Sequence, residues 1–280
     1  IKIISYIEKY YNKRIKRKEK IKMVISSKEN SIIKEVKKLK EKKYRKDKYI
    51  IEGYKMLKEA IFEKIKIDLA IVTEDFYNEN QDILKILILN KCNYIIVSTN
   101  VFKELTDVKT PQGIMAVVYK NKEDSINESA RYIMALDDVQ DPGNIGTIIR
   151  TLDSANIKQL IVSKGTVDAY SPKVVRSTMG AIFRVNVIEV ENLKDELDKL
   201  KQKGFKIVST SLQTDKSIYD INYDKKVVVI GNEANGVSKE IQDNSDIKVK
   251  IPMLGKTESL NASVAASIMI YEYVRRSLEK

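Results

Sequence analysis

The pattern of apolar and polar positions predicts an α/β protein with two domains. Across residues 48–119, short apolar runs predict strands, and apolar residues at every third or fourth position predict helices. The expected strands are 48–52, 69–73, 94–98 and 113–119, and the expected helices are 53–64, 82–89 and 101–105. Strands that alternate with helices indicate a mostly parallel sheet.

The same pattern restarts near residue 132. The expected strands are 133–136, 160–163, 185–190, 206–210, 227–230 and 247–251, and the expected helices are 145–155, 172–179, 192–203, 237–242 and 260–278. Several of these strands are nearly continuous apolar runs, which is typical of strands covered on both faces. The second half of the chain is therefore expected to form its own α/β domain.

The segments outside these patterns set the expected domain boundaries. Residues 121–130 are polar and are interpreted as a linker. Residues 31–46 show helical spacing on a lysine-rich helix, whose outer face lysines 37, 38, 40, 42 and 43 would cover. We therefore expect a basic, disordered extension at 1–22, a smaller domain at 23–120, the linker, and a larger domain at 131–280.

The positive charge is concentrated at the N-terminus. The chain has a net charge of +12, and residues 1–48 contain 19 Lys and Arg against 6 Asp and Glu, whereas the remainder contains 32 against 33. A basic arm on a near-neutral body is typical of nucleic-acid binding. Two alternatives are the residue bias of AT-rich coding sequence, which also favours Ile, Asn and Tyr, and an arm that binds a membrane surface.

Composition excludes several kinds of chemistry. The chain has no histidine, which excludes Ser-His-Asp and Cys-His catalysis and most zinc sites. Its one cysteine, Cys92, excludes an internal disulfide framework, and we expect no metal and a reducing, cytoplasmic compartment. No apolar run approaches the roughly 20 residues of a membrane span, so no membrane partner is expected.

Three polar clusters follow expected strands. They are 137–151 (DDVQDPGNIGTIIRT), 230–237 (IGNEANGV) and 251–263 (IPMLGKTESLNAS). Asn144 is a candidate N-cap, Gly231 permits close approach of a ligand, and free amides at the start of the last helix can receive a polar group. Taken singly, each cluster also fits an ordinary capped turn between a strand and a helix.

Together, in this order and spacing, the clusters are specific. The chain resembles the SpoU-type (TrmH-like) RNA ribose 2′-O-methyltransferases of the SPOUT class. The family's three motifs are matched by 141–146 with Arg150, by 231–236, and by 251–253 with 259–265. The resemblance covers roughly residues 131–276. Residues 49–119, with TPQG at 110–113, are similar to the L30e-like substrate-binding domain that often precedes this catalytic domain.

The resemblance implies a fold, a cofactor and an assembly. The C-terminal domain would be a trefoil-knotted α/β methyltransferase domain that binds S-adenosylmethionine. Family contacts with this cofactor carry over to Thr210, Gly231, Ile251 and Leu260, largely through backbone groups. Family members are dimers in which motif 1 of one subunit completes the site of the other, so a homodimer is expected.

The resemblance also implies a catalytic set. Arg150 matches the proposed catalytic arginine, and because a guanidinium is always protonated in proteins we expect it to clamp an RNA phosphate rather than act as a simple base. Glu233 is expected to anchor Arg150 or Asn144, while Ser259 and Asn261 orient the nucleophile. An N-terminal substrate-binding domain is more typical of ribosomal than of transfer RNA methylation in this family, so ribosomal RNA is the favoured substrate.

Three alternatives stay open at this point. A transfer RNA ribose methyltransferase would use the same motifs on another substrate. A non-catalytic RNA-binding protein would combine the basic arm with a degenerate knot, although the intact Arg150, Glu233 and Asn261 argue against it. A SPOUT enzyme that methylates a base is disfavoured by the arginine and the Ser-Leu-Asn sequence at 259–261.

Overall fold

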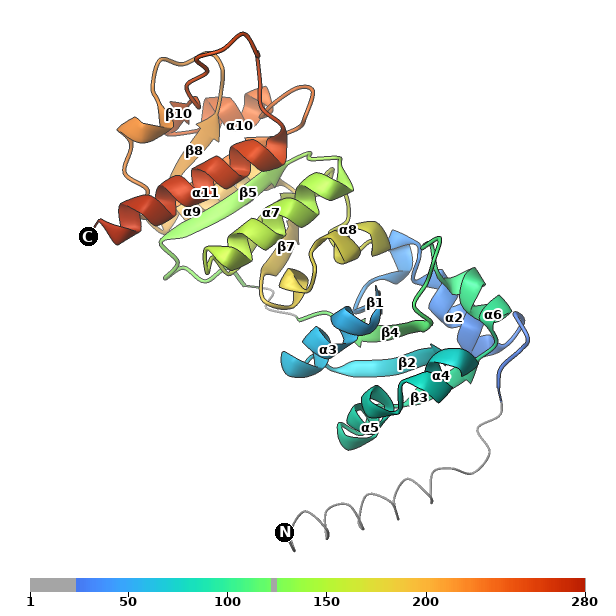
Figure 1. Ribbon diagram of the computed structural model, residues 1–280. Helices are drawn as coiled ribbons and strands as arrows, with labels where there is room; N and C mark the ends of the chain where they lie inside the picture. The colour runs from blue at the N-terminus through green and yellow to red at the C-terminus, as the bar shows by residue number, and fades with distance from the viewer. Residues whose placement is uncertain (1–23, 122–124, 280) are drawn as a thin grey trace, which may run out of the picture. The chain divides into compact units, whose positions relative to one another are not determined.

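The chain divides into two compact units, Ile1–Lys120 (unit 1) and Asn121–Lys280 (unit 2), which Figure 1 shows in the ribbon. The computed structural model describes residues 24–121 and 125–279. The basic extension expected at 1–22 lies outside these residues. Among the described residues, no helix combines the length and the apolar character that crossing a membrane requires.

Unit 1 is a four-stranded sheet with helices on both faces. Its strands are β1 (Lys48–Glu52), β2 (Ile67–Thr73), β3 (Tyr94–Val97) and β4 (Ile114–Tyr119). Its α-helices are α2 (Ser31–Lys38), α3 (Tyr54–Phe62), α4 (Glu74–Glu79), α5 (Gln81–Leu89) and α6 (Thr99–Leu105), with a 3₁₀ turn η1 (Lys42–Tyr44). Helix α4 was not expected, because its sequence EDFYNE carries no apolar period; the hydroxyl of Thr73 caps its first turn.

The prediction of a mostly parallel sheet is wrong for unit 1. The strand order is β1-β4-β2-β3, and β4 runs antiparallel to both of its neighbours. Only β2 and β3 pair in parallel. The connection from β3 to β4 consists of the seven-residue helix α6 and residues 106–113, and it leaves the chain at the same end of the sheet. Strand β4 therefore starts at the end where β1 and β2 finish and runs back between them.

The lysine-rich helix is shorter than expected, and its charges are largely paired. Helix α2 ends at Lys38 rather than continuing to residue 46, in a run where like charges three and four positions apart oppose a longer helix. Glu104 accepts from Lys28 and Lys37, and Lys40 contacts Asp107. Ile33 and Val36 bury the inner face of α2 against α6.

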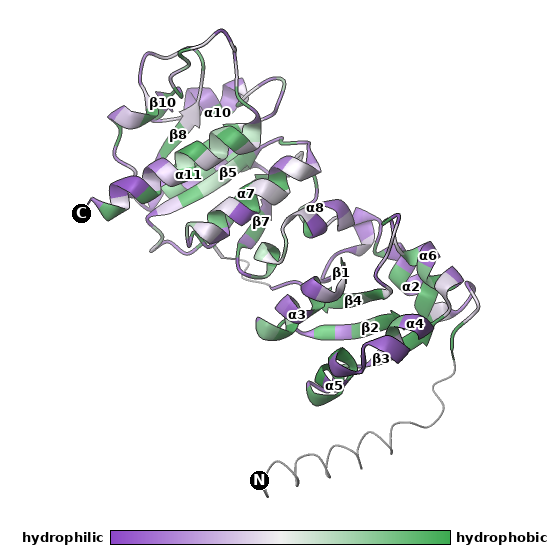
Figure 2. Ribbon diagram, viewed as in Figure 1, coloured by the Kyte–Doolittle hydropathy of each residue, from purple (hydrophilic) through white to green (hydrophobic). Residues whose placement is uncertain are grey.

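Figure 2 shows that the strands β2 and β4 are largely hydrophobic, whereas α10 of unit 2 is largely hydrophilic. The hydrophobic character of the strands follows from layer packing, because strands with helices on both faces bury side chains in both directions. In unit 1, one core lies between the sheet and the helices α2 and α6 and contains Ile71, Phe102 and Met115.

Unit 2 has six strands and covering helices. Its strands are β5 (Tyr132–Asp137), β6 (Gln159–Ser163), β7 (Asn186–Val190), β8 (Lys206–Thr210), β9 (Lys226–Gly231) and β10 (Ile247–Val249). Its α-helices are α7 (Pro142–Ser154), α8 (Pro172–Ser177), α9 (Leu193–Gln202), α10 (Lys239–Asn244) and α11 (Ala262–Leu278), and its 3₁₀ turns are η2 (Ala181–Phe183) and η3 (Ile218–Asp220).

The sheet of unit 2 is parallel throughout, in the order β10-β8-β9-β5-β6-β7. Helix α11 contacts α7 and β9 on one face, and α9 and α10 pack on the opposite face, as Figure 1 shows. Leu193, Leu197 and Leu200 of α9 pack on Ile133 and Val229 of the sheet. The continuous apolar runs are thus strands covered on both sides.

The segment expected as a linker has contacts within unit 2. Ile126 and Ala130 pack against the core beneath α9. The backbone N–H of Asn127 donates to the side chain of Gln159 over 2.9 Å. Residues 125–130 therefore lie against the sheet of unit 2.

Candidate active site

A cavity of about 450 Å³ opens in unit 2 where β8, β9 and β10 end. Parallel strands finish at the same edge of a sheet, so the loops that follow them converge there. The cavity is formed by the loop after β8, the turn after β9, the loop after β10 and the first turns of α11. Thr210, Gly231, Ile251 and Leu260, the four expected cofactor contacts, all line it.

The turn after β9 has a shape that only glycine permits at its start. A Cβ on Gly231 would lie 2.0 Å from backbone atoms of Gly236 and Val237, which is closer than atoms can approach. Asn232 and Gly236 exchange two backbone hydrogen bonds of 3.0 and 2.9 Å, and Gly236 has a φ of 69°. The turn therefore folds back on its own strand and presents backbone groups to the cavity.

Glu233 joins this turn to the loop after β5. Its carboxylate accepts from the side-chain amide of Asn144 over 2.8 Å and from the backbone N–H groups of Asp141 and Gln140 over 3.0 and 3.1 Å. Partial burial acts to raise the pKa of Glu233, but the hydrogen bonds from Asn144 and the two backbone donors outweigh it and lower that pKa overall. The carboxylate is thus held ionised by its three donors.

The expectation that Asn144 caps its helix is wrong. Helix α7 begins at Pro142, a residue suited to the first helical position, so the cap falls on Asp141. The side chain of Asp141 accepts from the backbone N–H of Asn144 over 2.9 Å. The buried side chain of Asn144 is thereby available to donate to Glu233 instead.

Arg150 lies apart from the cavity. It is an exposed residue of α7 and is absent from the cavity wall. Its guanidinium makes no hydrogen bond or ion pair with any residue that the structure describes. Of the two partners suggested for Glu233, Asn144 is therefore the one it contacts within the chain, and Arg150 is not.

Ser259 and Asn261 lie on either side of Leu260 before α11. Ser259 is exposed and lines the cavity. The side-chain oxygen of Asn261 caps α11: it accepts from the backbone N–H of Ser263 and Val264 and from the hydroxyl of Ser263, over 2.9, 3.3 and 2.7 Å. Asn261 thus fixes the direction in which the chain enters α11.

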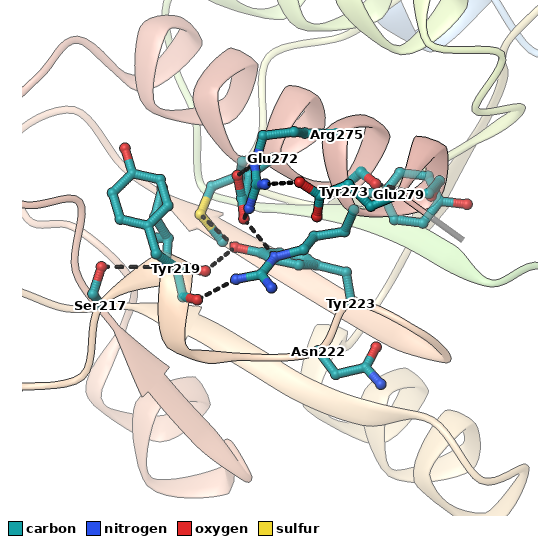
Figure 3. A network of polar contacts seen from close by, with 12 residues as sticks. Ser217, Tyr219, Asn222, Tyr223, Glu272, Tyr273, Arg275 and Glu279 are labelled. Atoms are coloured by element: carbon teal, nitrogen blue, oxygen red, sulfur yellow. Dashed lines mark hydrogen bonds and ion pairs between the residues drawn. The ribbon is translucent and has the colours of Figure 1, made fainter.

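The other end of α11 is anchored by the polar network of Figure 3. The buried carboxylate of Glu272 accepts two hydrogen bonds of 2.8 Å from Arg275 and one of 2.9 Å from Arg276. Arg276 also donates to the backbone carbonyl of Tyr219 in η3. The bonds from Arg275 lower the pKa of Glu272, although burial opposes them. The network ties α11 to the segment that follows the cavity loop after β8.

A model of the SpoU rRNA methylase family matches residues 131–271, half of the chain, and this range contains the whole cavity. The chain belongs to the SpoU rRNA methylase family. A model of the MRM3-like substrate-binding domain matches residues 30–116, within unit 1. The two matches confirm the predicted family and the α/β fold class with an N-terminal substrate-binding domain.

Relatives of this SpoU family chain include the 23S rRNA (guanosine(2553)-2′-O)-methyltransferase RlmP of Bacillus subtilis. The two are 36% identical over 177 residues, which is 63% of this chain and 70% of the relative. An AdoMet-bound rRNA methyltransferase from Sinorhizobium meliloti is 28% identical with a TM-score of 0.80, over 91% of this chain and 98% of that one. An RNA 2′-O-ribose methyltransferase structure is 28% identical with a TM-score of 0.75, over 91% and 100%. These relatives and the family confirm the prediction of an RNA methyltransferase.

Sequence reasoning did not identify several cavity residues of this SpoU domain. They lie in the loop after β8 and are Ser211, Leu212 and Gln213. Leu212 is 67% exposed, and an apolar residue within the polar run SLQTDK was a usable signal. The described residues contain no group of His, Cys, Asp and Glu side chains that could hold a metal ion.

Proposed function

We propose that the protein transfers a methyl group from S-adenosylmethionine to a ribose 2′-hydroxyl of RNA, with ribosomal RNA as the substrate. The observation that carries the proposal is the cavity of unit 2. It brings Thr210, Gly231, Ile251 and Leu260 to one place in a domain of the SpoU family. Its volume lies within the roughly 300–1,000 Å³ that small-molecule sites occupy.

The cavity suits a cofactor that is held mainly by backbone. Ile251 and Leu260 are half-buried and offer apolar surface to a flat ring. The turn at Gly231 and the loop after Thr210 offer backbone amides and carbonyls for the polar edge of the ring. The AdoMet-bound relative from Sinorhizobium meliloti supports the same cofactor here.

S-adenosylmethionine, when bound, supplies a methyl group already activated by its sulfonium. The protein then has to align the 2′-hydroxyl with that methyl group and accept a proton late in the reaction. Alignment alone contributes roughly 7–11 kcal/mol to lowering such barriers. Ser259, exposed at the cavity, is placed to orient the hydroxyl.

Arg150 binds the RNA rather than the cofactor. Its exposed guanidinium is outside the cavity and has no partner among the described residues, which leaves its planar fork available for bidentate contact with a phosphate. Because it lies outside the cavity of its own chain, we place it at the cavity of a second subunit. The protein is then a homodimer in which α7 of one subunit completes the site of the other.

Glu233, Asn144 and Asn261 act as positioning residues. Glu233 and Asn144 couple the turn after β9 to the start of α7, the helix that carries Arg150. Asn261 sets the entry of α11 at the cavity. The first contact joins two of the three motifs, and the second orders the third motif locally. The trefoil knot and a cytoplasmic location stay predictions from the family resemblance and the composition.

Unit 1 is proposed to bind the RNA substrate, as the match to a substrate-binding domain supports. Its lysines at 28, 37 and 40 already pair with acidic side chains, so they attract phosphate less than their number suggests. The sequence predicts that the N-terminal lysines provide the general affinity for RNA. That prediction therefore rests more on residues 1–22, which lie outside the described residues.

Nucleoside analysis tests the reaction. The full chain is incubated with methyl-labelled S-adenosylmethionine and, in parallel reactions, with ribosomal RNA or transfer RNA from a strain that lacks the gene, and each RNA is digested to nucleosides. Label in a 2′-O-methylnucleoside supports the proposal, and label in a methylated base contradicts it. Label in transfer RNA but not in ribosomal RNA would assign the other ribose substrate. Failure to bind S-adenosylmethionine in calorimetry would leave the non-catalytic RNA-binding protein.

A further inference from the structure

A second cavity lies in unit 1, separate from the residues proposed for methyl transfer. Its volume is about 460 Å³, which is again in the range of small-molecule sites. It is lined by residues that follow β1, β2 and β3 and by the 111–113 segment before β4. The antiparallel return of β4 therefore brings the TPQG sequence of 110–113 to the same end of the sheet as the first turns of α3, α4 and α6.

Aromatic side chains form part of its wall. Tyr54 and Phe76 face each other with ring centroids 6.4 Å apart and planes tilted by 50°. Phe76 is buried and Tyr54 is half-buried, so Tyr54 offers the accessible ring. The ammonium group of Lys58 lies 5.4 Å from the centroid of that ring. An aromatic ring beside a cation is the arrangement that holds an unpaired base next to its phosphate.

Two carboxylates at this cavity lack partners in a unit where most acids are paired. Asp75 and Glu79, four positions apart on α4, are exposed residues of the cavity wall and contact no ionic or hydrogen-bonding partner among the described residues. Other acidic side chains of the unit bind nearby groups, as with Asp68 and Lys48, Asp107 and Lys40, Glu52 and Thr106, and Glu104 with Lys28 and Lys37. The cavity thus concentrates acceptors that no group of the described chain uses.

Gln112 adds one donor with a fixed direction. Its side-chain oxygen accepts from the backbone N–H of Tyr54 over 2.8 Å. That bond sets the orientation of the amide and leaves its NH₂ group without a partner among the described residues. The wall therefore combines one donor, two carboxylate acceptors and an accessible aromatic ring.

We propose that this cavity binds an unpaired base of the RNA substrate, with guanine preferred, at a nucleotide distinct from the one that is methylated. Guanine presents two adjacent donors, N1–H and the 2-amino group, to the carboxylates, and its O6 accepts from the amide of Gln112. A phosphate is disfavoured beside Asp75 and Glu79. The proposal rests on the proposed function, because it takes RNA as the molecule that unit 1 binds.

Fluorescence anisotropy with short RNA probes tests the base site. The full-length protein is titrated with labelled nonauridylate and with versions that carry a central guanosine, inosine or adenosine. We expect the guanosine probe to bind about ten-fold tighter than nonauridylate, a typical discrimination for a well-paired base edge. Inosine, which lacks the 2-amino group, should fall between guanosine and uridine. Equal affinity for all four probes would overturn the proposal.

Substitutions test whether the preference for guanosine arises at this cavity. In the double variant Asp75→Asn with Glu79→Gln, the guanosine preference should fall below about two-fold, although removal of two negative charges strengthens binding of every RNA. Glu74→Gln is the matched control, since Glu74 lies on the same helix, lacks a partner among the described residues and does not line the cavity. It should keep the ten-fold preference. A preference that persists in the double variant contradicts the proposed site.

Calorimetry with S-adenosylmethionine on the same samples separates this proposal from the proposed function. Wild-type protein that binds the cofactor and methylates RNA without a guanosine preference would overturn the base site alone. The double variant should bind the cofactor as the wild type does, because Asp75 and Glu79 lie in the other unit. That result shows that the substitutions leave the cofactor site of unit 2 intact, and an unchanged circular dichroism spectrum and melting curve show that unit 1 of the variant is folded.

Discussion

The two cavities of the protein differ in how their polar side chains are used. In unit 2, the side-chain oxygens of Glu233 and Asn261 each accept from three donors of the chain itself, and these bonds fix the turn after β9 and the start of α11 beside the cavity. In unit 1, Asp75, Glu79 and the amide of Gln112 have no such partners among the described residues. The first cavity is shaped by hydrogen bonds within the chain, whereas the second has donors and acceptors that no other group of the described chain uses.

This difference predicts different sensitivities to substitution. A site whose shape is fixed by internal hydrogen bonds recognises its ligand through preorganisation, so it is damaged most by changes that move the backbone. A site with unpaired side chains is damaged most by removing those side chains. Arg150, which has no partner among the described residues, is a residue of unit 2 that follows the second rule.

Arg150→Ala should give the largest effect. We expect methyl transfer to fall by about 10²- to 10³-fold, because an oriented charged donor is lost, while affinity for S-adenosylmethionine stays within about three-fold. Single-turnover methylation and calorimetry measure the two quantities. Arg150→Lys retains the charge without the planar fork and should recover only part of the rate. Loss of cofactor binding in Arg150→Ala would make the residue structural.

Gly231→Ala should come next. The added Cβ would collide with the backbone of Gly236 and Val237, so the turn has to move and the cavity with it. We expect affinity for S-adenosylmethionine to fall about 100-fold, equivalent to about 2.7 kcal/mol. Gly255→Ala is the control, because a Cβ there meets nothing within 4 Å. Equal affinity in the two variants would show that the turn does not shape the site.

Glu233→Gln should have a moderate effect. Glutamine has one acceptor oxygen where the carboxylate has two, and its NH₂ group would face a donor. We expect cofactor affinity to fall five- to ten-fold, or about 1 kcal/mol, since water partly replaces the lost bonds at this exposed side chain. Glu240→Gln changes an exposed carboxylate of α10 that does not line the cavity and should leave affinity unchanged. Calorimetry compares the two.

Glu272→Gln should give the smallest effect, and one that depends on pH. The folded pKa of Glu272 is lowered from 4.5, so its contribution is complete above that value and is lost as pH falls through the folded pKa. Hydrogen exchange of the α11 amides should show about 1 kcal/mol less protection in the variant at pH 7.

The difference between wild type and Glu272→Gln should begin to shrink below pH 4.5 and vanish as pH falls through the lowered pKa of the folded protein, where the wild-type carboxyl becomes protonated. Glu279→Gln removes an exposed partner of Arg275 and should cost less than about 0.5 kcal/mol at any pH. A gap for Glu272→Gln that is constant from pH 7 to pH 3 would assign its effect to packing instead of charge.

Much of the fold could be predicted because unit 2 is built from nearly continuous apolar runs, and such runs are typical of strands that are covered on both faces. Strand β8 was predicted with its bounds, 206–210, and the other strands to within a few residues. The direction of β4 could not be predicted in this way, because it depends on the path of the connection from β3 and not on any periodicity. Helix α4 was missed since only its cap at Thr73 marks it.

The candidate site was predictable to the extent that it lies next to strand ends. The four expected cofactor contacts line one cavity, because loops that follow parallel strands must converge. Pairings across the chain were not predictable from local pattern. The local sequence favours Asn144 as a cap, but the helix begins earlier, at Pro142. The contact of Asn144 with Glu233 joins two positions that are 89 residues apart, which no local pattern connects. Cofactor contacts and catalytic roles stay predictions.

The strand order of unit 2 has a consequence for synthesis of the chain on the ribosome. Strand β5 is made first, but one of its two neighbours is β9, and Tyr132 lies opposite Lys226. That edge of β5, with its apolar residues, has no partner until most of the unit has emerged. Pairings between distant positions close slowly and expose unpaired edges meanwhile. We therefore expect unit 2 to complete its fold only late in translation, after unit 1, whose β1 and β4 have already met.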